Sequence, residues 1–270
     1  MTPEELVSLY RALPIDTLVR TDSGQTQIKN NFRVIVECKR YISGLNSYTQ
    51  GVRGAVRKYL AAMAKISGSG VTTNGEGWAL NSLDLDPIPL ITDLNVTHAL
   101  SGKGTPREIQ NTGRILSLML PDPEHSKKLC GAGSITELAS WFFGMDCNGF
   151  TGVYQVLEGD STNAKLPNIA CKHQISGKEL RASLTDIQDL DLVFNTGSPD
   201  HIAIINSVTS RKPDLIECTI CEARDPKFGG AQTNEWKILK AKSGWHLYRQ
   251  FEGKSVGVDP RIADKIVSYY

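Results

Sequence analysis

One cysteine stands where a thiol can act as a nucleophile. Cys147 follows Gly144 and Asp146, and the apolar residues at positions 150, 153, 154 and 157 have the spacing of a helical stripe. We therefore expect a helix that begins at or just after Cys147. The N–H groups and the positive dipole end at a helix start stabilise a thiolate, and cysteines in this setting act as nucleophiles. The alternative is a small buried cysteine with a structural role.

A nucleophilic cysteine needs a general base, and that base needs a group that orients it. Downstream of Cys147, His201 opens the apolar, β-branched run 201–205, which predicts a strand. We predict that His201 accepts the proton of the thiol. His246 and His173 are the alternatives if His201 does not serve.

A carboxylate lies near the end of the next strand-like run, 215–223. Because side chains alternate along a strand, Glu222 shares a face with Cys218 and Ile220. A carboxylate at the end of an apolar face needs a partner, and we propose that His201 is this partner. The alternative is a glutamate at a strand end that reaches solvent.

The pair Cys218 and Cys221 has C-x-x-C spacing, and with Cys171 and His173 it could supply four zinc ligands. On a strand, however, residues three apart point to opposite faces, so the two thiols would diverge. We therefore expect no metal here. No Walker loop or dinucleotide motif follows a strand, so no nucleotide cofactor is expected.

The segments that carry these residues resemble a known hydrolase family. Asp-Cys-Asn-Gly-Phe at 146–150 is similar to the Asp-Cys-Ser-Gly motif of the NlpC-type cysteine peptidases and their CHAP amidase relatives. The segment 191–205 resembles the family's Gly-Asp-Leu-Val-Phe and His-Val-Gly-Ile stretches, and Glu222 matches the place of its third polar residue. The order of the three residues is the family's unpermuted order. The resemblance covers roughly the C-terminal half of the chain.

Three residues depart from the family pattern. Asn148 replaces the usual serine, and Gly144 is what remains of a Gly-Gly loop before the nucleophile. Glu222 stands where many members have a second histidine, although CHAP members use Glu or Asn there. The first two departures concern the shape of the substrate groove rather than the nucleophile.

The resemblance implies an α+β protein with a papain-like core, in which the helix bearing Cys147 packs on an antiparallel sheet. It implies a cysteine hydrolase that cleaves an amide bond in peptidoglycan peptides and needs no cofactor. In that reaction Cys147 attacks the carbonyl carbon, His201 transfers the proton, and Glu222 orients the imidazole. The backbone N–H of Cys147 is a candidate oxyanion donor. A bacterial effector or phage lysis factor would fit, with an immunity or inhibitor protein as a further partner.

Two other functions are compatible with the same residues. One is a cytosolic protease, deamidase or transglutaminase that acts on protein. The other is a catalytically inactive binding module that has kept the fold. Replacing Cys147 by alanine separates them, because binding would survive the change and hydrolysis would not.

The composition is that of an ordinary globular protein. The 270 residues are 40% hydrophobic and 22% charged, and the formal net charge of +1 favours neither nucleic acid nor an anionic membrane. Six cysteines are too few for a disulfide scaffold at this length. No signal-peptide pattern and no run of 18 apolar residues occurs, so we expect synthesis in the cytoplasm and no membrane insertion. A cell-wall substrate would then require export by another route.

The first half of the chain is expected to be mainly helical. Capping boxes at Thr2, Thr105 and Ser134 each predict a helix start, and the longest apolar stripe predicts a helix over 52–66. The polar stretch 21–31 predicts a loop.

The proline-rich break at 121–125 is the predicted domain boundary. It separates a mainly helical N-terminal region, 1–125, which could be a substrate lobe, a cap or an extension, from a hydrolase domain, 126–270. Within the latter, strands are also expected at 170–175 and 245–251.

Overall fold

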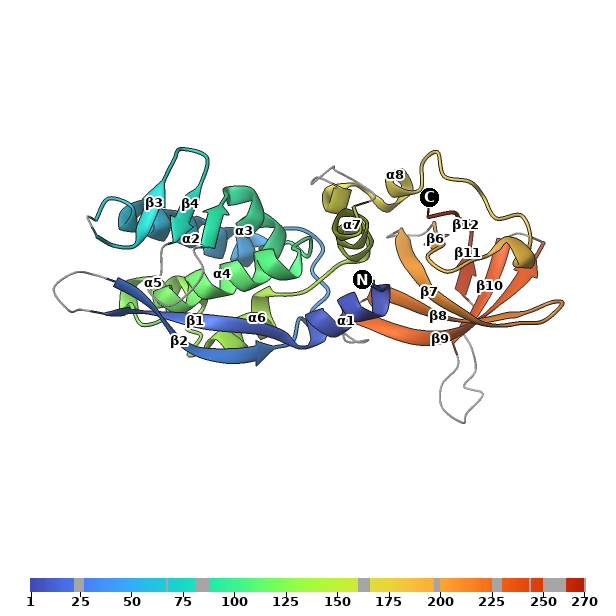
Figure 1. Ribbon diagram of the computed structural model, residues 1–270, viewed down its shortest axis with the longest axis horizontal. Helices are drawn as coiled ribbons and strands as arrows, with labels where there is room; N and C mark the ends of the chain where they lie inside the picture. The colour runs from blue at the N-terminus through green and yellow to red at the C-terminus, as the bar shows by residue number, and fades with distance from the viewer. Residues whose placement is uncertain are drawn as a thin grey trace. The chain divides into compact units, whose positions relative to one another are not determined.

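The chain divides into two compact units (Figure 1). We call Leu9–Met145 the helical unit, and Met1–Ser8 together with Asp146–Tyr270 the sheet unit. The computed structural model describes residues 1–21, 27–66, 68–80, 88–159, 166–196, 200–224, 230–242, 244–249 and 261–269.

The helical unit combines α-helices with two small antiparallel sheets, one formed by β1 and β2 and the other by β3, β4 and β5. Its helices are the end of α1 (Pro3–Arg11), α2 (Ser47–Met63), α3 (Asp93–Leu100), α4 (Pro106–Met119), α5 (Pro123–Ser126), the 3-10 turn η1 (Lys127–Leu129) and α6 (Ile135–Phe142). Its strands are β1 (Leu13–Thr21), β2 (Gln27–Val36), β3 (Val71–Thr73), β4 (Trp78–Leu80) and β5 (Ile88–Ile91). The predicted division after residue 125 differs from this grouping, because α6 packs against β2 and α4.

The predicted helices begin where their capping residues require. The hydroxyl of Thr2 accepts a hydrogen bond from the backbone N–H of Glu5 at 3.1 Å, and Thr105 accepts one from Glu108 at 3.2 Å. Ser134 caps α6 in the same way. These bonds satisfy N–H groups that have no acceptor within the helix, which is why the short sequence signal is reliable.

The loop prediction for 21–31 is wrong for residue 21, which ends β1, and for residues 27–31, which belong to β2, while 22–26 lie outside the described residues. The β1–β2 hairpin escapes the period-2 pattern because its register shifts between Asp16 and Leu18. In addition, β2 exposes the apolar side chains of Phe32 and Ile35. The N-terminal region therefore carries two small sheets beside its helices.

The sheet unit is built on one seven-stranded antiparallel sheet with the strand order β11-β10-β9-β8-β7-β6-β12. Its helical segments are α7 (Cys147–Leu157), η2 (Leu166–Asn168), α8 (Cys171–Gln174) and η3 (Leu184–Asp186). Its strands are β6 (Leu192–Asn195), β7 (His201–Arg211), β8 (Ile216–Arg224), β9 (Gly230–Ala241), β10 (Gly244–Arg249), β11 (Arg261–Ala263) and β12 (Lys265–Val267). The strand predicted at 245–251 is present as β10, and residues 250–251 lie outside the described residues.

The sheet curls until adjacent pieces of the chain form its two edges (Figure 1). β11 pairs with β10 at one edge and β12 pairs with β6 at the other, and only Asp264 separates β11 from β12. The inner face buries an apolar cluster that includes Ile220, Trp236 and Trp245. Burial of this cluster is the main force that holds the sheet in its curled form.

The two strands predicted to carry His201 and Glu222 are confirmed. β7 begins at His201 and runs antiparallel to β8, with Ile204 opposite Cys221. Two bulges interrupt the pairing farther along β7, within residues 205–210. The bulges therefore lie within β7, away from the end that carries His201.

The fold class is α+β with antiparallel sheets, as predicted. On the sheet unit, α7 packs against β7 and β8. Within the described residues, no helix is both long and apolar enough to cross a membrane.

Candidate active site

Cys147 is the first residue of α7, as the sequence predicts. The carboxylate of the preceding residue, Asp146, caps the helix by accepting a hydrogen bond from the backbone N–H of Gly149 at 2.7 Å. Phe150 and Val153 are fully buried on the helix stripe, which fixes the helix on the unit. The Cys147 side chain is therefore held in the first turn of a helix, where the dipole favours a negative charge.

A hydrogen-bond network holds a second segment against this first turn. The Gln174 side-chain amide donates to the carbonyl oxygens of Asn148 at 2.8 Å and Ile169 at 3.1 Å. The Asn148 side chain donates to Ile169 at 2.9 Å, and the Thr151 hydroxyl donates to Gln174 at 2.7 Å. Because Gln174 and Thr151 are buried, the network fixes α8 beside α7.

This arrangement corrects the strand predicted at 170–175. Residues Cys171–Gln174 form the short helix α8, and Gln174 turns its amide toward α7 rather than into a ladder. The same arrangement gives Asn148 a structural role, since its side chain reaches Ile169.

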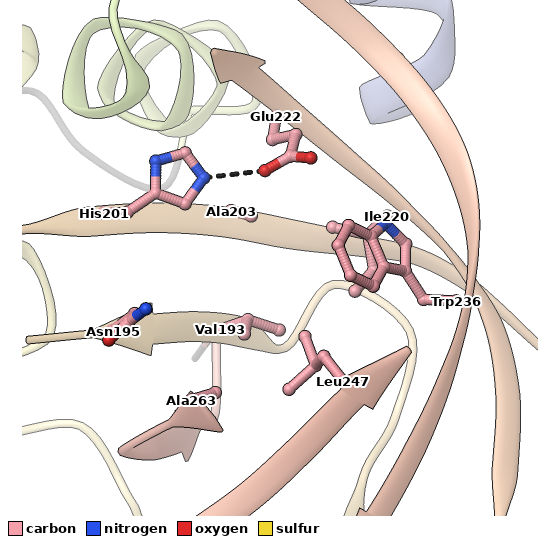
Figure 2. A pocket seen from close by; sticks show the side chains of 9 residues that line it. All are labelled: Val193, Asn195, His201, Ala203, Ile220, Glu222, Trp236, Leu247 and Ala263. Carbon is pink, nitrogen blue, oxygen red and sulfur yellow. Dashed lines mark hydrogen bonds and ion pairs between the residues drawn. The ribbon is translucent and has the colours of Figure 1, made fainter. Parts of the chain in front are cut away.

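His201 and Glu222 lie in contact, as predicted (Figure 2). The His201 Nε2 atom is 2.7 Å from the Glu222 Oε2 atom. The glutamate is 1% exposed, whereas the histidine side chain keeps 24% of its surface in contact with solvent. The alternative of a solvent-reaching glutamate does not hold, because the second carboxylate oxygen is 3.5 Å from the Arg224 guanidinium.

Two neighbouring groups favour the charged form of the His201 ring. Burial lowers the pKa of His201, but hydrogen bonds to Cys147 and Glu222 and their negative charges outweigh burial and raise it to about 9. Since Nε2 contacts Glu222, Nδ1 is the ring nitrogen available to the thiol. Burial instead raises the pKa of Cys38 and Cys218 to about 12. At neutral pH the site therefore favours an imidazolium, and only Cys147 among these thiols lies beside one.

A hollow of about 330 Å³, including its solvent-open mouth, lies beside the pair of His201 and Glu222. Figure 2 shows both side chains on its wall together with Asn195. The remaining lining is apolar and comes from the inner face of the sheet: Val193, Ala203, Ile220, Trp236, Leu247 and Ala263. The pair thus lies where the apolar interior of the curled sheet meets its polar rim.

Cys171 is the functional candidate that sequence reasoning did not place in the site. Its Sγ atom is 3.6 Å from the Sγ atom of Cys147, and both thiols lie within 3.9 Å of the backbone carbonyl oxygen of Asp200. The twenty-three residues between the two cysteines carry no pattern that would bring them together. The contact depends on the Gln174 network, which only the folded chain forms.

The remaining alternative bases and ligands make other contacts or lie on other elements. His246 contacts the Tyr248 hydroxyl at 3.4 Å on β10, and His173 lies in α8. Cys218 belongs to the apolar cluster inside the sheet, whereas Cys221 contacts the Thr233 hydroxyl at 3.2 Å. The part of the chain that the structure describes holds no group of three His, Cys, Asp or Glu side chains arranged for a metal ion.

Gly144 has a structural explanation of its own. A Cβ atom at this position would lie 2.1 Å from the Arg40 carbonyl oxygen, so no side chain fits. The backbone N–H of Met145 donates to the same oxygen at 2.9 Å. Gly144 therefore allows a close backbone approach within the helical unit.

Comparisons of the chain with family models, with curated proteins and with solved structures found no match. The geometry of the site and the sequence resemblance are therefore the basis for assigning a function.

Proposed function

We propose that the protein is a cysteine hydrolase that cleaves an amide bond. The observation that carries this proposal is the position of His201, whose ring is hydrogen-bonded to the Glu222 carboxylate at 2.7 Å. The Cys147 sulfur, at the start of α7, is 3.8 Å from the carbonyl oxygen of Asp200, the residue that precedes His201. A nucleophile, a base and an orienting group in contact are what such a reaction needs.

Each residue has a defined role in the proposed reaction. The Cys147 thiolate attacks the carbonyl carbon, and the backbone N–H of Cys147, in the first turn of α7, is the proposed donor to the oxyanion. His201 then gives its Nδ1 proton to the leaving amine and later takes a proton from the water that hydrolyses the thioester. Glu222 holds the ring and stabilises its charged form. Each of these steps uses side-chain and backbone groups of this chain together with water.

The finer assignment is a papain-like hydrolase of the NlpC and CHAP type that acts on peptidoglycan peptides. Its support is the segment 146–150, the placement of His201 at the start of β7, and α7 packed on antiparallel strands. A cell-wall substrate would require export from the cytoplasm, and a toxic hydrolase would be paired with an immunity or inhibitor protein.

Alkylation of Cys147 by iodoacetamide tests the thiolate and imidazolium pair. We expect rapid labelling at pH 6–7, well below the ordinary thiol pKa of about 8.5, and a loss of at least about tenfold in the rate for His201→Ala. Cys130, which is exposed, serves as the internal control because its labelling should follow an ordinary thiol and ignore His201. Equal rates for Cys147 in both proteins would overturn the pairing.

Digestion of purified peptidoglycan then tests the substrate. Release of amino groups by the wild type and not by Cys147→Ala supports the proposal. Rapid thiol labelling without any release would retain the cysteine hydrolase and reject peptidoglycan as its substrate.

A further inference from the structure

The proposed nucleophile has a second thiol as its neighbour. The Cys147 and Cys171 sulfur atoms are 3.6 Å apart, and both residues are buried. A disulfide bond has a length of about 2.05 Å, so the two atoms would need to approach by roughly 1.5 Å. Rotation about side-chain bonds moves sulfur atoms over distances of this order without moving the backbone far.

Cys171 is held in this position by a specific network. Gln174, one turn farther along α8, donates hydrogen bonds to the carbonyl oxygens of Asn148 and Ile169, and Thr151 on α7 donates to Gln174. These contacts tie α8 to the first turn of α7. The closeness of the two thiols therefore follows from buried polar contacts rather than from a loose loop.

Within the described part of the chain, which includes all six cysteines, the other four make no contact with a second thiol comparable to that of Cys147 and Cys171. Cys218 and Cys221 point to opposite faces of β8, and Cys38 is buried in the helical unit. Burial raises the pKa of all three to about 12, which keeps them protonated and unreactive. Cys130 is exposed and belongs to the helical unit.

We propose that Cys147 and Cys171 are a redox modification site, at which a hydroperoxide converts the two thiols into a reversible disulfide. His201 supports the first step because an imidazolium beside Cys147 favours the reactive thiolate. Cys171 supports the second step because its sulfur is the neighbour of the sulfur that has been oxidised.

The two steps balance as follows. The Cys147 thiolate attacks one peroxide oxygen, the O–O bond breaks, and the other oxygen leaves as an alcohol or water after taking a proton, which produces a sulfenic acid. The Cys171 thiol then loses its proton and its sulfur attacks the Cys147 sulfur. The S–O bond breaks, and the hydroxide combines with that proton to form water. The peroxide gains two electrons, and each cysteine gives one.

The disulfide would both block the reaction of the proposed nucleophile and protect it from further oxidation. A sulfur in a disulfide cannot attack a carbonyl carbon, and it is not oxidised further to sulfinic acid as a sulfenic acid is. A small thiol or dithiol restores both cysteines by exchange. The effect on hydrolysis depends on the proposed function, whereas formation of the disulfide does not.

Peptide mapping after treatment with hydrogen peroxide tests the proposal. Trypsin leaves Cys147 in the peptide 129–165, which also contains Cys130, and Cys171 in the peptide 166–172. The test therefore uses the Cys130→Ala protein. Cys130 is exposed, and without it Cys147 is the only cysteine in the peptide 129–165, so any link to 166–172 must involve Cys147. We expect this link to form in the folded protein, with the loss of two hydrogen atoms, and to disappear after dithiothreitol.

Two controls make the result specific. Cys171→Ala in the same background should leave Cys147 as a sulfenic acid that reacts with dimedone, and then as a sulfinic acid. Cys221→Ala, which removes another buried thiol, should leave the link intact.

Oxidation of Cys147 to sulfinic acid in the Cys130→Ala protein without the link to 166–172 would overturn the proposal. So would an equal yield of the link in urea-unfolded protein, because the folded geometry would then be irrelevant. Neither result depends on hydrolysis, and the proposed function stands or falls separately on the iodoacetamide rates of wild type and His201→Ala.

Discussion

Replacement of Glu222 by glutamine separates the charge of this residue from its shape. The amide keeps the size of the carboxylate and can still accept a hydrogen bond from His201 through its oxygen, but it carries no negative charge. The structure places the carboxylate 2.7 Å from the ring and 1% exposed, so little solvent screens the interaction.

The magnitude follows from the protonation of the ring. The pKa of His201 is raised from 6.5 to about 9, a shift worth about 3 kcal/mol in favour of the charged form. Cys147 and Glu222 both oppose the effect of burial. Removing one of the two negative charges should therefore lower the pKa by at least about one unit, which is a factor of about ten in the protonation equilibrium.

The assay is a pH titration of the His201 imidazole by NMR, with the resonance assigned from the His201→Ala protein. We expect the midpoint of Glu222→Gln to fall below that of the wild type, and Cys147 alkylation near pH 7 to slow with it. The same variant also removes the ion pair between Arg224 and Glu222, because the amide carries no charge. A folded Glu222→Gln protein whose His201 titrates at the wild-type midpoint would refute the reasoning.

Two further predictions concern stability. The raised pKa of His201 contributes stability that is fully present below pH 6.5 and is lost as the pH rises to about 9. The stability advantage of wild type over His201→Ala, measured in urea titrations, should therefore shrink by about 3 kcal/mol across that window. A difference that is constant with pH would contradict this. Asp146→Ala removes the cap on Gly149 and should lower the free energy of unfolding by about 1 kcal/mol, whereas Asp146→Asn should retain most of it; equal losses in both variants would show that the cap is not the cause.

The parts of the site that the sequence predicts are those set by local chemistry. The start of α7 follows from a capping residue and an apolar stripe, and the shared face of Ile220 and Glu222 follows from strand alternation. The contact between Glu222 and His201 is predicted from the order of the strands and from the family resemblance. The structure places these two side chains in contact.

The parts that the sequence does not predict depend on contacts between distant segments. The approach of Cys171 to Cys147 is set by the buried amide of Gln174, which has no signature in the sequence. The β1–β2 hairpin is hidden for a different reason, since a register shift breaks its alternation and Ile35 is 58% exposed. Local rules carry no information on either feature.

The bulges in β7 separate the site from the far end of its own hairpin. Before the bulges begin, residues 201–204 of β7 pair with β6 and residues 204–205 pair with β8, whereas the turn to β8 at 212–215 follows the bulges. A bulge absorbs an extra residue locally by changing twist instead of shifting the whole register. The turn is therefore a place where a peptide tag or a spectroscopic label can be inserted while the spacing of His201 and Glu222 is kept, so the protein can be followed through this hairpin.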